Sequence, residues 1–253
     1  MAFGVVGGGG RTCVGARGHV CAGQVRVAGR STGARCEECA RLDRAHSVAA
    51  DTFVDDPRPY SVYLAWFGPG LVKVGITGVE RGSARLLEQG AVLFSWLGRG
   101  PLMAARRTEE LLRAALAVPD RIPYADKRAV RSALPEAAER VRELAELHAG
   151  AGRLADWPES LERAPFQPVD HSGVFGLAGL LAAYGVVSEL VPGARVSGEL
   201  LAAAGPDLHL ATRRGVVVLD TRLLPGWELT AGPADGELTA PVREFGGHQG
   251  GLF

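Results

Sequence analysis

The stretch YSVYLAWFGPGLVKVGIT, residues 60–77, decides the fold of the central part of this 253-residue chain. Residues 60–65 alternate and are rich in aromatic and β-branched side chains, which predicts a strand. Gly68-Pro69-Gly70 is a tight turn, and residues 71–76 form a second predicted strand. Because the connection is short, the two strands are expected to pair as an antiparallel hairpin.

The residues after this hairpin continue the pattern. Apolar spacing and stop signals such as Gly90 define one more strand and three helices. These elements are expected at residues 80–89 (helix), 91–97 (strand), 102–116 (helix) and 135–148 (helix), with a loop over 121–128. The central part is therefore predicted to be a small three-stranded antiparallel sheet with flanking helices.

Two other regions flank this module, so the whole chain is predicted to be an α+β protein of three consecutive parts. Asp55-Asp56-Pro57-Arg58-Pro59 is a stiff polar break. Residues 153–169 contain three prolines and look like a linker, and short apolar runs separated by Gly and Pro follow them. We expect a cysteine region over 1–56, the central module over 57–150, and a linker with a small mainly-β domain over 151–253.

All four cysteines of the chain lie near its start, at Cys13, Cys21, Cys36 and Cys39. Cys36-Glu37-Glu38-Cys39 has the CxxC spacing with which two thiolates grip one ion, and the other pair can complete a tetrahedral site. The segment is rich in glycine and poor in large apolar residues, so a metal would supply stability that burial cannot. These features predict a zinc-ribbon-like segment with one structural Zn²⁺.

Other interpretations of the cysteines stay open. Two disulfides are disfavoured by an intracellular location, and a thioredoxin-type redox pair needs a strand before the CxxC, which is not evident here. The Cys13–Cys21 gap is wider than the usual zinc spacing. His19 or His46 could replace a cysteine ligand, although a lone histidine is more often a surface residue.

Chemically useful residues recur in order along the central module. The first strand carries Ser61-Val62-Tyr63, and the second carries Lys73-Val74-Gly75 with Thr77 two residues later. The first helix carries Arg85, and the second carries Glu109. Over residues 60–117, this order of elements and residues resembles the GIY-YIG nuclease superfamily.

The sequence departs from that superfamily's pattern in two places. The first strand lacks the leading glycine, and Lys73 stands where the second motif has a tyrosine. The first helix begins two residues later than in the superfamily, so Arg81 is an alternative to Arg85. In the second helix Glu110 is an alternative to Glu109, although Glu109 fits the spacing of small residues and leucine better. The layout with a Cys-rich front and a β-rich tail is also similar to an uncharacterised prokaryotic family.

The resemblance implies a catalytic site for phosphodiester hydrolysis. Tyr63 would act as the general base, with its pKa lowered by the neighbouring cation of Lys73. Arg85 would clamp the phosphate with its planar guanidinium. Glu109 would hold a single Mg²⁺ or Mn²⁺ on the side of the leaving group.

Each of these residues also has an ordinary structural interpretation. Lys73 could protect a strand edge from aggregation, and Arg85 could pair with Glu88 or Gln89 on its own helix. Glu109 and Arg113 have the spacing of a helical i,i+4 ion pair. Taken together, four suitable residues on the expected elements favour the site.

Composition and charge limit the remaining choices. The content of 47% hydrophobic and 22% charged residues is that of a globular protein. No apolar run is long enough for a membrane span, and the start lacks the pattern of a signal peptide, so a cytoplasmic protein is expected.

Charge is unevenly distributed along the chain. Residues 1–50 hold seven Arg and three acids, whereas residues 151–253 hold seven basic and twelve acidic residues. A nucleic acid would therefore meet the front of the chain.

Lysine is scarce in this sequence, which makes the few lysines informative. Lys73 and Lys127 are the only two, against 28 basic residues in all. Arg and Lys differ in geometry and hydration, so a lysine kept in an Arg-rich chain suggests a need for an ammonium group.

The leading hypothesis is a divalent-metal-dependent nuclease whose zinc segment helps to dock nucleic acid, expected to be DNA. The alternative is a non-catalytic, zinc-containing nucleic-acid-binding or scaffold protein that kept the fold without the activity. The missing glycine, the altered second motif and the net charge of zero support this alternative.

Overall fold

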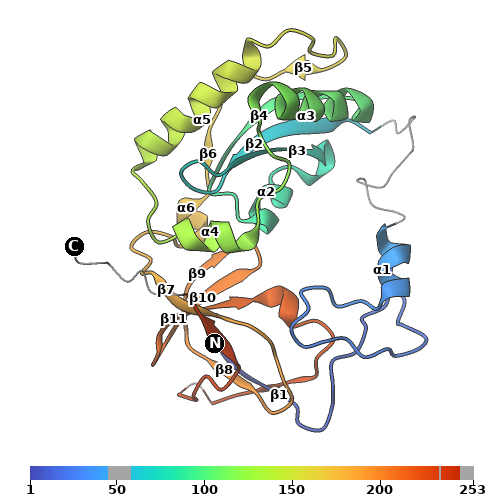
Figure 1. Ribbon diagram of the computed structural model, residues 1–253, viewed down its shortest axis with the longest axis vertical. Coiled ribbons are helices and arrows are strands. Elements are labelled where there is room, and N and C mark those ends of the chain that lie inside the picture. The colour runs from blue at the N-terminus through green and yellow to red at the C-terminus, as the bar shows by residue number, and fades with distance from the viewer. Residues whose placement is uncertain (45–57, 234, 246–253) are drawn as a thin grey trace, which may run out of the picture. The chain divides into compact units, whose positions relative to one another are not determined.

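A computed structural model describes residues 1–44, 58–233 and 235–245, and it is an α+β fold with several antiparallel sheets (Figure 1). The chain divides into two compact units rather than three consecutive parts. One unit combines Met1–Thr52 with Leu181–Phe253, and the other is Phe53–Leu180. The two ends of the chain build one unit because an N-terminal strand pairs with strands of the tail. The expected break at residues 55–59 lies mostly outside the described residues.

The central unit contains the predicted hairpin and third strand. These strands are β2 (Tyr60–Trp66), β3 (Val72–Gly78) and β4 (Leu93–Gly100), in the antiparallel order β3-β2-β4. The sequence prediction of a three-stranded sheet with flanking helices is confirmed for this core. The register between β2 and β4 shifts between Val62 and Tyr63, which places a bulge beside the tyrosine of the first motif.

The expected linker over 153–169 is not a linker, which corrects the sequence prediction. Two short strands, β5 (Glu162–Arg163) and β6 (Val169–Asp170), pair with β4 and extend the sheet. Leu161 is buried beside them, and the N–H of Ala164 donates to the carbonyl of Leu97. Each of these strands has only two residues, so the sequence is too short to show the alternating period of a strand.

Helices cover both faces of this sheet. The three predicted helices are observed, and a short helix replaces most of the loop that was expected over residues 121–128. Their bounds are η1 (Val79–Arg81), α2 (Ala84–Gln89), α3 (Leu102–Leu116), α4 (Tyr124–Val130), α5 (Ala137–Gly152) and α6 (Ser172–Phe175). The sequence missed α4 because its buried residue is Lys127, which breaks the apolar period that marks a helix.

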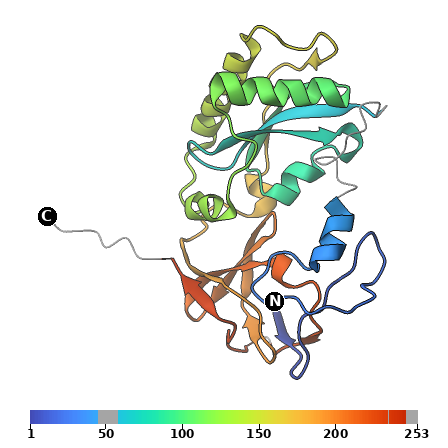
Figure 2. The same ribbon diagram turned by 45° about the vertical axis from the view of Figure 1, so that its right-hand side comes forward.

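The central strand β2 is buried on both faces, as its run of aromatic and aliphatic residues requires. Helices α3 and α5 lie on one face, and α2 and α4 lie on the other (Figure 1 and Figure 2). On the first face the indole N–H of Trp66 donates to the Glu143 carboxylate at 2.7 Å, and the Gly70 N–H donates to its other oxygen at 2.9 Å. On the second face, Tyr63 packs with Leu86 of α2.

The other unit is mainly β, as expected for the tail. One sheet has the order β12-β1-β8 and the other has the order β13-β7-β11-β10-β9. Their bounds are β1 (Ala2–Val5), β7 (Ala183–Val187), β8 (Arg195–Ser197), β9 (Glu199–Ala204), β10 (Asp207–Thr212), β11 (Gly215–Asp220), β12 (Leu229–Ala231) and β13 (Val242–Glu244). A 3-10 turn, η2 (Thr221–Leu223), follows β11.

Arg11 links the cysteine segment (residues 1–44) to the C-terminal part of the same unit through hydrogen bonds. Its side chain is 1% exposed. The guanidinium donates to the carbonyls of Ala28 and Ser31 in the cysteine segment, and to those of Pro225 and Arg222 in the tail. A single buried cation thus satisfies four carbonyl groups from two segments that are distant in sequence.

One more helix, α1 (Glu37–Arg44), closes the cysteine segment. In the part of the chain that the structure describes, no helix combines the length and apolar character needed to cross a membrane.

Candidate functional site

The hairpin brings the two motif residues Tyr63 and Gly75 directly opposite each other. A Cβ added at Gly75 would lie 2.6 Å from Cζ of Tyr63, so the tyrosine ring occupies the space that any side chain at this position would need. The glycine of the second motif is therefore explained by the position of the tyrosine of the first.

The Tyr63 side chain is 1% exposed, and its hydroxyl oxygen accepts a hydrogen bond from Gln89 Nε2 at 3.0 Å. Burial raises the pKa of the Tyr63 phenol, although the hydrogen bond from Gln89 and the charge of Arg85 act in the opposite direction. The sequence prediction that a neighbouring cation lowers this pKa is wrong for the protein as it stands, because the loss of hydration outweighs the nearby positive charge.

Lys73 lies one diagonal step from Tyr63 on the paired strand. Its Nζ is 5.7 Å from the centroid of the Tyr63 ring and donates to the carbonyl of Asp120 at 3.0 Å. Burial and, to a smaller extent, the charge of Arg85 lower the pKa of the Lys73 ammonium from its ordinary value of 10.5 to about 8. At neutral pH Lys73 is thus a cation that gives up its proton unusually easily.

Glu109 projects from α3 and is half-buried, whereas the rival Glu110 is exposed. Burial raises the pKa of the Glu109 carboxyl, and the charge of Asp120 raises it further, against the opposing effect of Lys73. The Glu109 charge in turn raises the pKa of both Tyr63 and Lys73. Glu109 is therefore close enough to both side chains to interact with them electrostatically.

The two candidate arginines share one acidic partner. Arg81 pairs with Glu88 at 2.6 Å, and Arg85 pairs with Glu88 at 3.5 Å. Arg85 affects the pKa of Tyr63 more strongly than Arg81 does, and it also affects Lys73. The structure thus favours Arg85 as the nearer cation, while its pairing with Glu88 matches the ordinary interpretation of a solvated helix residue.

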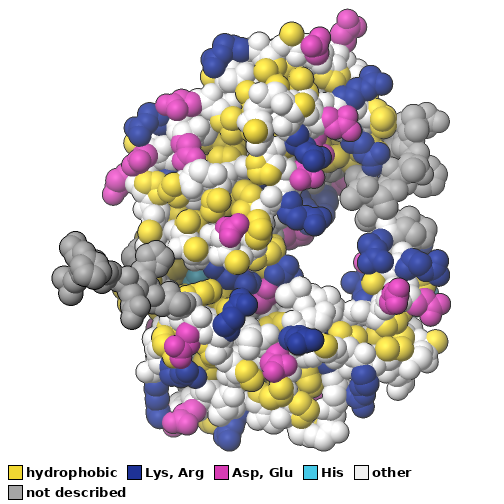
Figure 3. Space-filling view, viewed as in Figure 1, with side chains coloured by type: hydrophobic (Ala, Val, Ile, Leu, Met, Phe, Trp, Pro, Cys, Tyr) yellow, Lys and Arg dark blue, Asp and Glu magenta, His cyan; other side chains and the backbone are white. Residues whose placement is uncertain are grey.

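The sheet and its helices thus bring all four predicted side chains into one electrostatic neighbourhood at the edge of β3. Basic and acidic side chains lie together on the surface over β3 and α2 (Figure 3). Arg113, which has i,i+4 spacing from Glu109 on α3, forms an ion pair with Asp120 at 3.6 Å. Asp120 follows α3, and the N–H of Val74 donates to the neighbouring carbonyl of Pro119, which holds this segment against the edge of β3.

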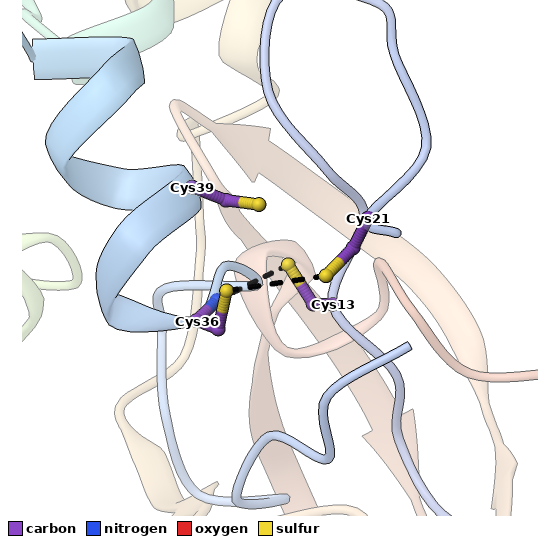
Figure 4. A group of neighbouring side chains, drawn as sticks. All are labelled: Cys13, Cys21, Cys36 and Cys39. Atoms are coloured by element: carbon purple, nitrogen blue, oxygen red, sulfur yellow. Dashed lines mark hydrogen bonds between the residues drawn. The ribbon is translucent and has the colours of Figure 1, made fainter. Parts of the chain in front are cut away.

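The second candidate site is the cysteine cluster, whose four side chains converge (Figure 4). The Sγ atoms of Cys13, Cys21, Cys36 and Cys39 all lie within 4.8 Å of one another, and Cys21 Sγ is 4.0 Å from Cys36 Sγ. Four thiolates around one tetrahedral ion would be separated by roughly 3.8 Å at a metal–sulfur distance of about 2.3 Å. The cluster therefore has the size and the donor set that a thiophilic metal ion requires.

A tight turn accounts for the wide gap between the first two cysteines. Ala16 and His19 exchange two backbone hydrogen bonds, with Arg17 and Gly18 at positive φ between them. Gly15, at φ 80°, approaches this turn so closely that an added Cβ would lie 2.8 Å from the carbonyl carbon of His19. The chain between Cys13 and Cys21 folds back on itself, so sequence spacing overstates the distance between the two thiols.

Local hydrogen bonds prepare the cluster for a positive ion. Burial raises the pKa of the Cys13 thiol, but the N–H groups of Cys36 and Gly15 donate to its sulfur and lower the pKa to about 7. Hydrogen bonding with Cys36 and then burial raise the pKa of Cys39 to about 12. A first thiolate forms readily, while further ones are opposed until a cation offsets their repulsion.

The other uses of the cysteines are less compatible with the structure. All four are free thiols. An irregular loop rather than a strand precedes Cys36, so the CxxC lacks the environment of a thioredoxin pair. His19 serves the turn, and His46 lies outside the described residues.

Comparison with known proteins gives one match. A family model with the description "Protein of unknown function (DUF2797)" covers residues 16–229. The chain belongs to the DUF2797 family. Neither the curated proteins nor the solved structures contain a match to it.

Sequence reasoning missed some polar residues of this DUF2797 protein. Gln89 lies four positions after Arg85, so helical spacing alone would have placed both on one side of α2. Asp120 carried no such signal, because it follows α3 in an irregular segment. Lys127 stood out as one of only two lysines, but its place beside Gln89 could not be predicted because the pattern did not reveal its helix.

Proposed function

We propose that this DUF2797 protein is a divalent-metal-dependent nuclease of the GIY-YIG type, which hydrolyses phosphodiester bonds at the site formed by Tyr63, Lys73, Arg85 and Glu109. One observation carries the proposal. Tyr63, Lys73 and Glu109 come from three elements, each has a pKa displaced toward its neutral form, and each responds to a charge of the same small group. Clustered, perturbed ionisable groups are typical of catalytic sites, because structural residues seldom keep charges that burial disfavours.

The proposed roles follow from the chemistry of each side chain. Tyr63 would first release its proton to solvent, and the resulting phenolate would accept the proton of the attacking water. The Gln89 donor and the positive charge of Arg85 favour this phenolate. Lys73, with a pKa of about 8, is suited to exchange protons near neutral pH. Arg85 would leave Glu88 to bind the two oxygens of a phosphate in bidentate fashion.

The residues at this site also fit a hard divalent cation. Burial raises the pKa of the half-buried Glu109 carboxyl, and repulsion from the Asp120 charge raises it further. Carboxylate oxygens are the ligands that Mg²⁺ and Mn²⁺ prefer, and a cation would offset this repulsion. When bound, the ion would stabilise the negative charge that develops on the leaving oxygen.

We further propose that the cysteine cluster holds a structural Zn²⁺ and that its segment docks the nucleic acid, which we expect to be DNA. Residues 1–44 carry seven Arg against three acids. Basic side chains gather at α1, next to acidic ones (Figure 3), and Arg41 and Arg44 occupy its last turn. Such an excess of arginine favours phosphate contacts that do not depend on sequence.

The test compares two adjacent glutamates. Glu109→Gln keeps the size of the side chain but removes the charge that holds a divalent ion, so it should abolish cleavage and leave nucleic-acid binding largely intact. Glu110→Gln, the matched control, removes an exposed carboxylate from the same helical turn and should cleave like the parent protein. The substrates are branched, single-stranded and duplex nucleic acids, with and without Mn²⁺.

The outcome separates the two functional hypotheses. Tyr63→Phe should also abolish cleavage while keeping metal binding, because it removes only the proton acceptor. Equal cleavage by the parent and by Glu109→Gln at limiting metal would rule out Glu109 as the ligand. A parent protein that binds the panel but cleaves none of it would support the non-catalytic scaffold, a role compatible with the high pKa of Tyr63.

A further inference from the structure

Lys127, the second of the two lysines, is buried in the central unit. Its side chain is only 3% exposed. The Nζ atom lies 3.8 Å from the centroid of the Phe67 ring and 4.5 Å from that of the Tyr124 ring. A buried ammonium needs strong partners, and the faces of two aromatic rings provide part of the stabilisation that water would give.

The ammonium also holds the end of α2. Lys127 Nζ donates to the carbonyl oxygen of Gln89 at 3.1 Å. Gln89 is the last residue of α2, and Gly90 follows it in the left-handed conformation, with φ 69° and ψ 36°. The carbonyls at the end of a helix lack partners within the helix and attract cations, so Lys127 acts as a cap for this helix.

Gln89 thus connects two functional parts of the unit. Its backbone carbonyl accepts from Lys127, and its side-chain amide donates to the Tyr63 hydroxyl at 3.0 Å. Gln89 itself is 7% exposed, so its amide has little freedom to find another partner. Any shift of the end of α2 would move the donor relative to the Tyr63 oxygen.

Helix α4 is in turn packed firmly on the end of β2. Gly68 follows that strand, and a Cβ added to it would lie 3.0 Å from Cβ of Val130. This close approach packs α4 against the chain after β2 without involving the ammonium. Lys127 therefore reaches Gln89 from a helix whose position is set by other contacts.

We propose that Lys127 is a positioning residue that holds Gln89 in place as the hydrogen-bond donor to the Tyr63 hydroxyl. The role of Tyr63 as a proton acceptor rests on the proposed nuclease function, but the positioning does not. A donor aimed at the phenol oxygen favours the phenolate and leaves the tyrosine's own proton to point elsewhere. The compact ammonium of Lys127 lies over both rings and donates to the Gln89 carbonyl, whereas the larger guanidinium of an arginine would place its N–H groups elsewhere.

The experiment measures ionisation at position 63 without relying on cleavage. Tyr63 is replaced in the full chain by a fluorinated tyrosine whose phenol ionises near neutral pH, and its ultraviolet absorbance is titrated. The charged groups that act on this position, Arg81, Arg85, Glu109 and Lys73, stay unchanged throughout. Loss of the hydrogen bond from Gln89 to the phenolate should lower the ionisation constant of this phenol by about tenfold.

Three variants decide the matter. Gln89→Leu, which removes the donor, and Lys127→Met, which removes its support, should each lower the ionisation constant by about this factor. The double variant should lower it no further than Gln89→Leu alone, because both changes act through the same bond. Ala129→Ser is the matched control: it changes an exposed position of α4, keeps the contact with Gly68 and the bond to Gln89, and should leave the titration unchanged.

A titration of Lys127→Met equal to that of the parent would overturn the proposal and reduce Lys127 to a packing role. If this variant does not fold, Lys127→Arg, which keeps the charge, is titrated in its place. The ionisation constant of the phenol at position 63 should then fall below the parent value, and an unchanged value would contradict the proposal. Failure of the nuclease hypothesis is recognised separately, as an absence of cleavage in a parent protein whose titration still depends on Lys127.

Discussion

Replacing Lys73 by Met should make the protein more stable at neutral pH, although it removes a residue of the proposed site. Methionine keeps most of the aliphatic length of lysine and lacks the charge that burial opposes. The pKa of Lys73 falls from 10.5 to about 8 because the folded protein disfavours the ammonium. The parent protein is therefore less stable than the variant at any pH at which Lys73 is protonated in the folded state.

The size of the effect follows from the pKa values. At about 1.36 kcal/mol per tenfold change in the ionisation constant, the lowering to about 8 corresponds to roughly 3 kcal/mol. Lys73 is only partly buried and donates to the Asp120 carbonyl, so solvent screening and the lost hydrogen bond reduce the net gain. We expect Lys73→Met to raise the free energy of unfolding by about 1–2 kcal/mol at pH 7.

The pH dependence provides the decisive measurement. Between pH 8 and 10.5 the unfolded chain still binds the Lys73 proton while the folded chain has lost it, so the parent gains stability as the pH rises through this window. The advantage of Lys73→Met should shrink over the same range. Urea unfolding of both proteins at several pH values measures the difference. A variant less stable than the parent at pH 7, or a difference independent of pH, would refute the reasoning.

Two further predictions concern the unit built from both ends of the chain. Cys36→Ser combined with Cys39→Ser should remove about one Zn²⁺ per chain, measured by metal analysis after reducing, chelator-free purification, and should unfold the cysteine segment; a parent protein without zinc would end this hypothesis. Arg11→Met should lower the free energy of unfolding by about 2–5 kcal/mol in urea titrations, because four carbonyl groups lose their donor. A loss below about 1 kcal/mol would mean that water replaces the guanidinium.

Local sequence patterns account for much of the central sheet and for the residues proposed to react. The glycine turn at 68–70 and the apolar strands on either side of it specify the hairpin, and the hairpin alone places Tyr63 against Gly75 and near Lys73. These contacts are all between residues of a single hairpin. Their physical determinants, the pleat of a strand and the reach of a short loop, are readable from residue order.

The electrostatics of those residues could not be read in the same way. The sequence suggests that Lys73 lowers the pKa of Tyr63, whereas burial among residues of β4 and α2 raises it. Gln89, Asp120 and Lys127 reach the same neighbourhood from elements whose positions depend on packing. Desolvation is the sum of every atom that excludes water, so it exists only once distant segments have met.

The division of the chain was likewise decided by tertiary structure. The sequence by itself indicated that the four cysteines can meet around one ion, because the CxxC is a local feature. The turn that brings Cys13 and Cys21 together was seen only in the structure. The sequence did not reveal that β1 pairs with β8 and β12, nor that Arg11 joins the cysteine segment to carbonyls more than 200 residues away, with separations of 211 and 214 positions. After local structure has formed, some backbone N–H and C=O groups still lack a hydrogen-bond partner. In this chain the strands and the buried cation that satisfy them come from the opposite end of the sequence.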